Sequence, residues 1–152
     1  MAFYRAEDPR FLGLWLEATA GVRGALLAPA LDQAMHEARD VGPVLRGLTA
    51  AMGRENPEPS GPRIVEEVAR RNCCLRRGFM AAALDGLADG LELAEVKPAW
   101  DLETAVRLAE MGRSTDSSLA GAAVRLERYV PAQSLHRLEE APPESAEPPT
   151  PR

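Results

Sequence analysis

The sequence contains few of the residues that most often hold metals or carry out catalysis. Its 152 residues include two histidines and two cysteines. His36 and His136 are far apart, and Cys73 and Cys74 are adjacent, so neither pair has the spacing of a zinc site. No nucleophile elbow and no glycine-rich phosphate loop is found either. We therefore expect no metal, no cofactor and no enzymatic activity.

Long apolar runs are also missing. The longest, such as ALLAPAL, are far shorter than the roughly 20 residues that a membrane-spanning helix needs. Acidic residues at Glu7, Asp8 and Glu17 are not typical of a secretory signal peptide. Because adjacent cysteines give no disulfide framework, we expect an intracellular, reducing compartment and no membrane contact.

Positive charge is in the minority. The chain has 23 acidic and 18 basic residues, with a formal net charge of −5. A dedicated nucleic-acid-binding protein usually carries a basic surplus, and this chain does not. Aromatic residues make up 5% of the sequence, so few side chains are available to stack on bases.

The sequence is rich in alanine, leucine, glutamate and arginine, and it has a single isoleucine, Ile64. This composition favours helices over sheets. We predict an all-α bundle of about five or six helices over residues 1–140, followed by a disordered, acidic and proline-rich tail over 141–152. The expected helices cover 8–21, 29–41, 43–52, 63–96, 101–112 and a stretch around 119–126, with a short one over 134–140. Residues 53–62 (GRENPEPSGP) are typical of a loop.

The helix predicted over 63–96 would be the centre of the bundle, about 50 Å long at 1.5 Å per residue. No proline interrupts it before Pro98. Its apolar residues form two stripes, and a helix with two apolar stripes is normally buried on two sides. The second stripe is a candidate interface for a partner, and it consists of Cys73, Met80, Leu84, Leu87 and Leu91.

A basic ridge lies on the same predicted helix. Arg63, Arg70 and Arg77 are seven residues apart and would share one face, with Arg71 beside them. Three interpretations stay open: a solvent-exposed face with local ion pairs, a contact with a protein partner, and a contact with a phosphate backbone. Cys74 would be turned towards this ridge, where a nearby guanidinium would lower its thiol pKa, so it is a candidate reactive thiol.

The order of these segments resembles a known family. LWLEATAGVRGALLAPALDQAMHEARDV stands where that family has two helices, and IVEEVARRNCCLRRGFMAAALDGLADGLEL stands where it has a long helix with an Arg-Asn pattern. The region 14–93 thus resembles the helical domain of the first subunit of the GINS complex, a component of the eukaryotic replication helicase. Cys73 and Cys74 replace the basic residues that follow Arg-Asn in the family, and the family's small β-rich module has no counterpart here.

The resemblance implies a non-enzymatic role as a scaffold subunit of a hetero-oligomer in DNA replication, in the nucleus. Without it, we expect more generally an adaptor that binds protein partners. The alternative is a small helical factor, viral or from a mobile element, that contacts nucleic acid through Arg63, Arg70 and Arg77. A third hypothesis is a thiol enzyme or redox sensor at Cys74.

Overall fold

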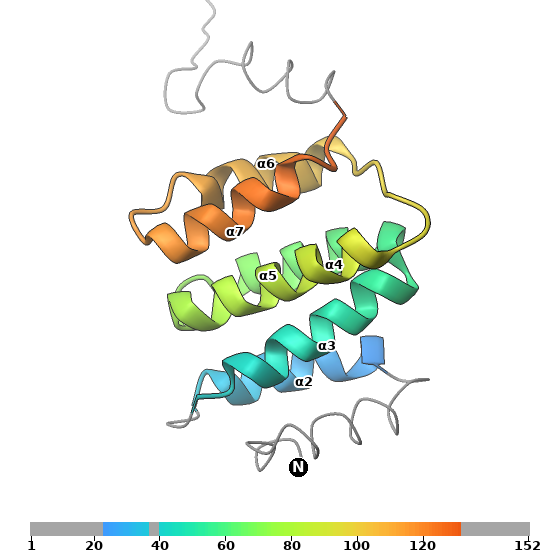
Figure 1. The fold of residues 1–152 in the computed structure, drawn as a ribbon. Coiled ribbons are helices and arrows are strands. Elements are labelled where there is room, and N and C mark those ends of the chain that lie inside the picture. The colour runs from blue at the N-terminus through green and yellow to red at the C-terminus, as the bar shows by residue number, and fades with distance from the viewer. Residues whose placement is uncertain (1–22, 37–39, 132–152) are drawn as a thin grey trace, which may run out of the picture.

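The computed structural model describes residues 23–36 and 40–131 (Figure 1). In these ranges the helices are α2 (Arg23–Ala34), α3 (Gly42–Glu55), α4 (Pro57–Arg70), α5 (Arg77–Leu93), α6 (Leu102–Gly112) and α7 (Ser117–Glu127). Neither described range contains a strand, and the all-α prediction is confirmed there. The helices predicted over 8–21 and 134–140 and the tail over 141–152 lie outside the described residues.

The helices are stacked in two layers (Figure 1). One layer contains α3, α5 and α7 side by side, and the other contains α2, α4 and α6. Within the first layer α5 lies in the middle and packs against both α3 and α7, and it also contacts α4 behind it. The described part of the chain therefore has α5 at its centre.

Aspartates begin the last two helices of the described ranges, as the sequence indicates. The side chain of Asp101 accepts a hydrogen bond from the backbone N–H of Thr104 at 3.0 Å. Asp116 accepts hydrogen bonds from the N–H groups of Ser118 and Leu119 at the start of α7. These carboxylates satisfy N–H groups that have no partner inside the helix. The predicted starts at Asp101 and in the segment after Gly112 are confirmed.

The loop predicted over 53–62 is wrong, because α4 begins inside it. Pro57 and Pro59 lie in the first turn of α4, where backbone N–H groups have no helical acceptor and their loss costs little. The Ser60 hydroxyl donates a hydrogen bond to the carbonyl of Met52 at 2.9 Å and so ties α4 to the end of α3. Pro57 and Pro59, which are typical of a loop in the sequence, lie at the beginning of a helix in the structure.

The single long helix predicted over 63–96 is also wrong. The structure ends α4 at Arg70, forms a turn over 71–76, and begins α5 at Arg77. Asn72, Cys73 and Cys74 in this turn are all weak helix formers. The break lets α5 turn back and pack beside α4, so that both helices bury apolar residues in the same core.

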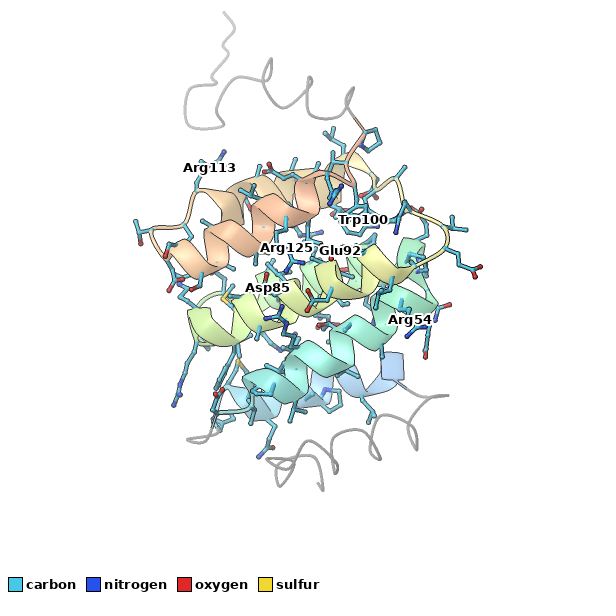
Figure 2. All side chains as sticks on the ribbon, in the orientation of Figure 1. Arg54, Asp85, Glu92, Trp100, Arg113 and Arg125 are labelled. Atoms are coloured by element: carbon cyan, nitrogen blue, oxygen red, sulfur yellow. The ribbon has the colours of Figure 1, made fainter. Side chains whose placement is uncertain are left out.

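Trp100 lies between the α6–α7 pair and the α4–α5 pair (Figure 2). It lies in the extended link between α5 and α6 and is 1% exposed. A Cβ atom at Gly61 of α4 would lie 2.1 Å from the indole, so only glycine lets the ring approach α4 this closely. The indole ring also packs against Tyr129, with ring centroids 5.6 Å apart. Trp100 thus links α4 to the end of α7.

Candidate functional site

A buried arginine fixes the turn over 71–76. The Nε of Arg71 donates to Oδ1 of Asp32 in α2 at 2.8 Å, and its Nη1 donates to Oε1 of Glu67 in α4 at 2.6 Å. Burial would lower the pKa of Arg71, but its hydrogen bonds to these carboxylates outweigh that effect and raise the pKa above its ordinary value. A buried cation with two carboxylate partners holds the start of the turn against two helices.

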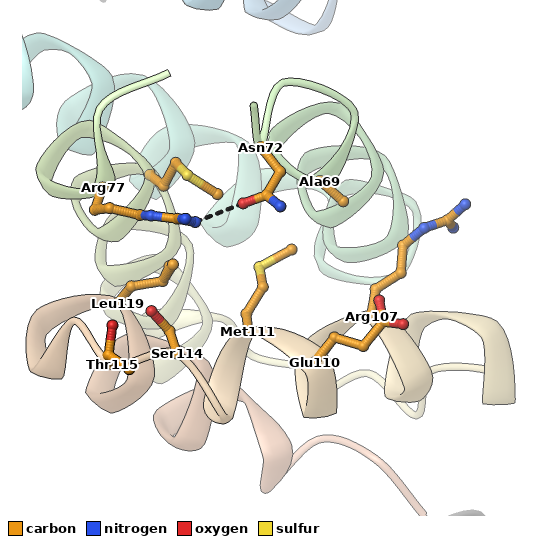
Figure 3. Close-up of a pocket in the computed structure, with 10 residues that line it drawn as sticks. Ala69, Asn72, Arg77, Arg107, Glu110, Met111, Ser114, Thr115 and Leu119 are labelled. Atoms are coloured by element: carbon orange, nitrogen blue, oxygen red, sulfur yellow. Dashed lines mark hydrogen bonds between the residues drawn. The ribbon is translucent and has the colours of Figure 1, made fainter. Parts of the chain in front are cut away.

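A pocket of about 290 Å³ opens beside this turn, between α4, α5 and α6 (Figure 3). We call it the α4–α6 pocket. Its apolar residues are Ala69, Met80, Met111 and Leu119. Its polar residues are Asn72, Arg77, Arg107, Glu110, Ser114 and Thr115. The pocket therefore combines an apolar lining that contains two methionines with a polar rim.

Arg77 lies across the pocket and points towards Asn72 on the other side (Figure 3). Its Nη1 donates to Oδ1 of Asn72 at 2.6 Å. It forms no ion pair with any carboxylate in the described ranges, unlike Arg107, whose Nη1 lies 3.3 Å from Oε2 of Glu103. Figure 3 shows the Arg107 guanidinium pointing away from the pocket. Arg77 is thus the cation of this pocket that can receive an anionic group.

The predicted basic ridge is divided between two helices. Arg63 and Arg70 lie on α4, whereas Arg77 is the first residue of α5, so the spacing of seven no longer aligns all three. The Nη2 of Arg70 pairs with Oε2 of Glu66 at 3.1 Å, and its Nη1 lies 3.6 Å from Oε1 of Glu67. Of the four predicted ridge arginines, Arg70 and the buried Arg71 are therefore already paired with carboxylates. The prediction of local ion pairs holds for these two.

The predicted partner stripe belongs to the protein's own core. Met80, Leu84, Leu87 and Leu91 are each 0% exposed, so a partner cannot reach them on the folded chain. Cys73, the first residue of this predicted stripe, is not buried with the others but exposed on the turn. The stripe forms the face that α5 presents to the other helices of the stack.

Cys74 is exposed as well, and its thiol lies in hydrogen-bond contact with that of Cys73. This hydrogen bond is the main cause that raises the pKa of the Cys74 thiol above its ordinary value. The expectation that a guanidinium lowers this pKa is therefore wrong. A raised pKa means less thiolate at neutral pH, which does not favour a nucleophilic cysteine.

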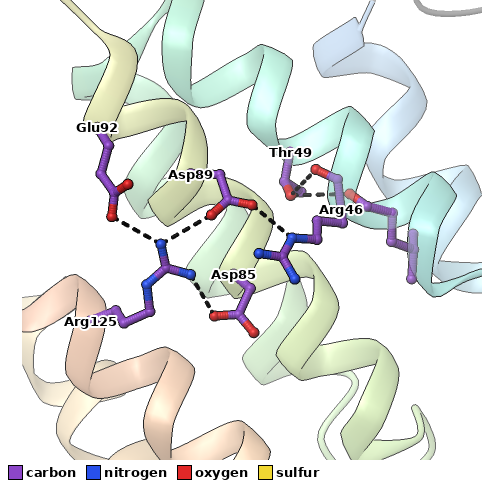
Figure 4. A network of polar contacts seen from close by, with 7 residues as sticks. Arg46, Thr49, Asp85, Asp89, Glu92 and Arg125 are labelled. Carbon is purple, nitrogen blue, oxygen red and sulfur yellow. Dashed lines mark hydrogen bonds and ion pairs between the residues drawn. The ribbon is translucent and has the colours of Figure 1, made fainter. Parts of the chain in front are cut away.

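A second polar cluster joins the three helices of one layer (Figure 4). Arg125 of α7 contacts three carboxylates of α5: Asp85 at 2.9 Å, Asp89 at 3.0 Å and Glu92 at 3.0 Å. Asp89 also accepts a hydrogen bond from Nε of Arg46 in α3 at 2.7 Å. Each charge in this cluster has a partner, so we assign it a structural role.

Partial burial would raise the pKa of Asp89. The hydrogen bonds from Arg46 and Arg125 outweigh that effect, and the pKa of Asp89 lies below its ordinary value. Its carboxylate is therefore charged at neutral pH. Across residues 23–36 and 40–131, no three His, Cys, Asp or Glu side chains come together as a group that could hold a metal ion.

Sequence reasoning missed most of the α4–α6 pocket. It singled out Arg77 as part of a basic ridge and Met80 as part of an apolar stripe, both on one helix, and it did not assign Met111, Ser114 or Thr115 to a site. These residues come to the pocket only because α6 packs against α4, which no local pattern reveals. The one available signal was the Asn-Cys-Cys segment, whose weak helix propensity marks the turn.

Comparison with known proteins gives no relative from which a role could be carried over: no protein-family model, no curated protein and no solved structure matches the chain. In the described part of the chain, no helix has the length and apolarity needed to cross a membrane.

Proposed function

We propose that this protein is a non-catalytic helical adaptor that binds a segment of a protein partner in the α4–α6 pocket. The observation that carries the proposal is Arg77, an exposed cation held across the pocket by Asn72 and without a carboxylate partner in the described residues. A partner carboxylate at this position would form a charge-assisted hydrogen bond, which is among the stronger interactions at interfaces.

The rest of the pocket suits an apolar side chain next to that carboxylate. Met111 brings a flexible, polarisable side chain that adapts to different apolar shapes. A volume of about 290 Å³ is at the low end of the range for small-molecule sites and suits one or two side chains of a peptide. Stacked helix pairs also serve as binding surfaces in other proteins, which agrees with an adaptor role.

Two more specific hypotheses receive less support. Nucleic-acid binding through the ridge needs several free cations, whereas Arg70 and Arg71 are already paired with carboxylates. The resemblance to the GINS subunit stays a hypothesis from the sequence, and no protein-family model or solved structure matches the chain. The proposal therefore keeps a protein partner and names no particular assembly.

Selection of displayed random peptides on the immobilised chain tests this proposal. We expect the enriched peptides to share an Asp or Glu next to a large apolar residue. The Arg77→Ala variant should bind them about 10- to 100-fold more weakly, because a hydrogen bond to a charged group is worth about 1.5–3 kcal/mol. Affinities would be measured by fluorescence polarisation of labelled peptides.

Arg113→Ala is the matched control, because it removes the same charge from an exposed residue outside the pocket lining (Figure 2). It should bind the selected peptides as the wild-type chain does. The proposal fails if no peptide is enriched, or if Arg77→Ala and Arg113→Ala bind the peptides equally well.

A further inference from the structure

Cys73 and Cys74 present their sulfur atoms on the same side of the turn. The two Sγ atoms are in contact, and both residues are exposed. Neither cysteine lines the α4–α6 pocket. The pair is therefore a feature separate from the proposed peptide site.

The turn is what brings the two thiols together. On a helix, consecutive side chains are rotated by about 100° and point to different faces. The chain leaves the helical path after Arg70, and the side chains of residues 73 and 74 converge instead. The ion pairs of Arg71 with Asp32 and Glu67 hold the beginning of this turn in place.

We propose that Cys73 and Cys74 form a dithiol site for trivalent arsenicals, in which one arsenic atom bonds to both sulfurs. Trivalent arsenic is a soft, three-coordinate and pyramidal centre, so two of its sulfur ligands lie close together on one side. Soft centres select thiolate ligands. A linear two-coordinate ion would instead need sulfurs on opposite sides, which converging thiols do not offer.

The reaction balances without an oxidant or a reductant. With phenylarsine oxide, two As–S bonds form and the arsenic–oxygen bond breaks. The two thiol protons leave with the oxygen as one molecule of water. Arsenic stays trivalent, and the protein gains one phenylarsenic group that bridges the two sulfurs.

Intact-mass spectrometry of the full chain tests this site. The chain is reduced with a phosphine, mixed with one equivalent of phenylarsine oxide, and then treated with an excess of glutathione. We expect one phenylarsenic group for each chain, which survives this monothiol because both As–S bonds would have to be exchanged. The small dithiol 2,3-dimercaptopropanol should remove it.

Cys73→Ser and Cys74→Ser each leave one thiol and should lose the arsenical completely in the glutathione excess. Circular dichroism spectra like that of the wild-type chain show that they remain folded, and one N-ethylmaleimide adduct on each shows that the remaining thiol is accessible. The proposal is overturned if the wild-type chain loses the arsenical to glutathione, or if either serine variant retains it equally well. Failure of a remaining thiol to react would also overturn it.

Discussion

Glycine is required at two residues of α5, where α3 crosses it. A Cβ atom at Gly86 would lie 2.2 Å from the backbone carbonyl oxygen of Arg46. A Cβ atom at Gly90 would lie 2.1 Å from the carbonyl oxygen of Ala50. These neighbours are backbone atoms of α3, which cannot move aside as the end of a side chain can. The close approach of the two helices therefore depends on the absence of a side chain.

Gly86→Ala should lower the free energy of unfolding, because α3 must shift to make room for the new methyl group. Overpacking of this kind costs about 1–3 kcal/mol, which exceeds the gain of up to about 1 kcal/mol in helix propensity. Urea denaturation followed by circular dichroism measures the change.

Gly78→Ala is the matched control in the same helix, since a Cβ atom there would meet no neighbouring atom within 4 Å. It should stabilise the chain by about 0.4–1 kcal/mol, because alanine has less conformational freedom to lose on folding. An unchanged or higher stability of Gly86→Ala would show that α3 and α5 are not in close contact at this point.

At the scale of elements, the ion pairs of Arg125 join α7 to α5, and Arg46 extends the cluster to α3 (Figure 4). The pKa of Asp89 is lowered in the folded chain. Its contribution to stability is therefore present above the unfolded pKa of about 3.9 and is lost as the pH falls through the lower folded pKa. Acid should weaken the contact between these helices.

Arg125→Met should be less stable than the wild-type chain at pH 7, because three carboxylates of α5 then lie close together without this cation. The difference should shrink as the pH falls from about 5 to 2, where the carboxylates become protonated in both proteins. Urea denaturation across this pH range measures it. Arg113→Met, an exposed residue, is the control and should follow the wild-type curve. A difference that is constant with pH would contradict the electrostatic explanation.

The sequence predicted the helices whose first and last residues are set by neighbouring residues in the chain. Asp101 begins a helix through its own carboxylate, and Gly112 ends it, so both limits are visible in the chain. The turn over 71–76 is different, because Arg71 forms an ion pair with Asp32, which is distant in the sequence. The α4–α6 pocket likewise depends on the packing of α6 against α4. No periodic pattern in the sequence indicates either the turn or the pocket.

At the scale of the whole molecule, a stack of helix pairs can unfold in two ways. In repeat-like arrays each pair contacts only its neighbours, and the ends can open separately. Here α5 packs against α3, α4 and α7, and its residues Met80, Leu84 and Leu87 are completely buried. Because α5 contacts the helices on both of its sides, we expect the described helices to unfold together.

Leu84→Ala tests this cooperativity, because it leaves a cavity in the middle of α5 and should cost about 2–5 kcal/mol. Hydrogen exchange measured by mass spectrometry should show the slowest exchange of the wild-type chain in α5. In the variant, exchange should become faster by a similar factor in α3, α5 and α7, since opening of α5 exposes both of its neighbours. Val124→Ala, at a residue of α7 that is 56% exposed, is the control and should leave all three helices unchanged. If α7 lost protection while α3 kept it, the two sides of the stack would be opening independently, and α5 would not be the element that joins them.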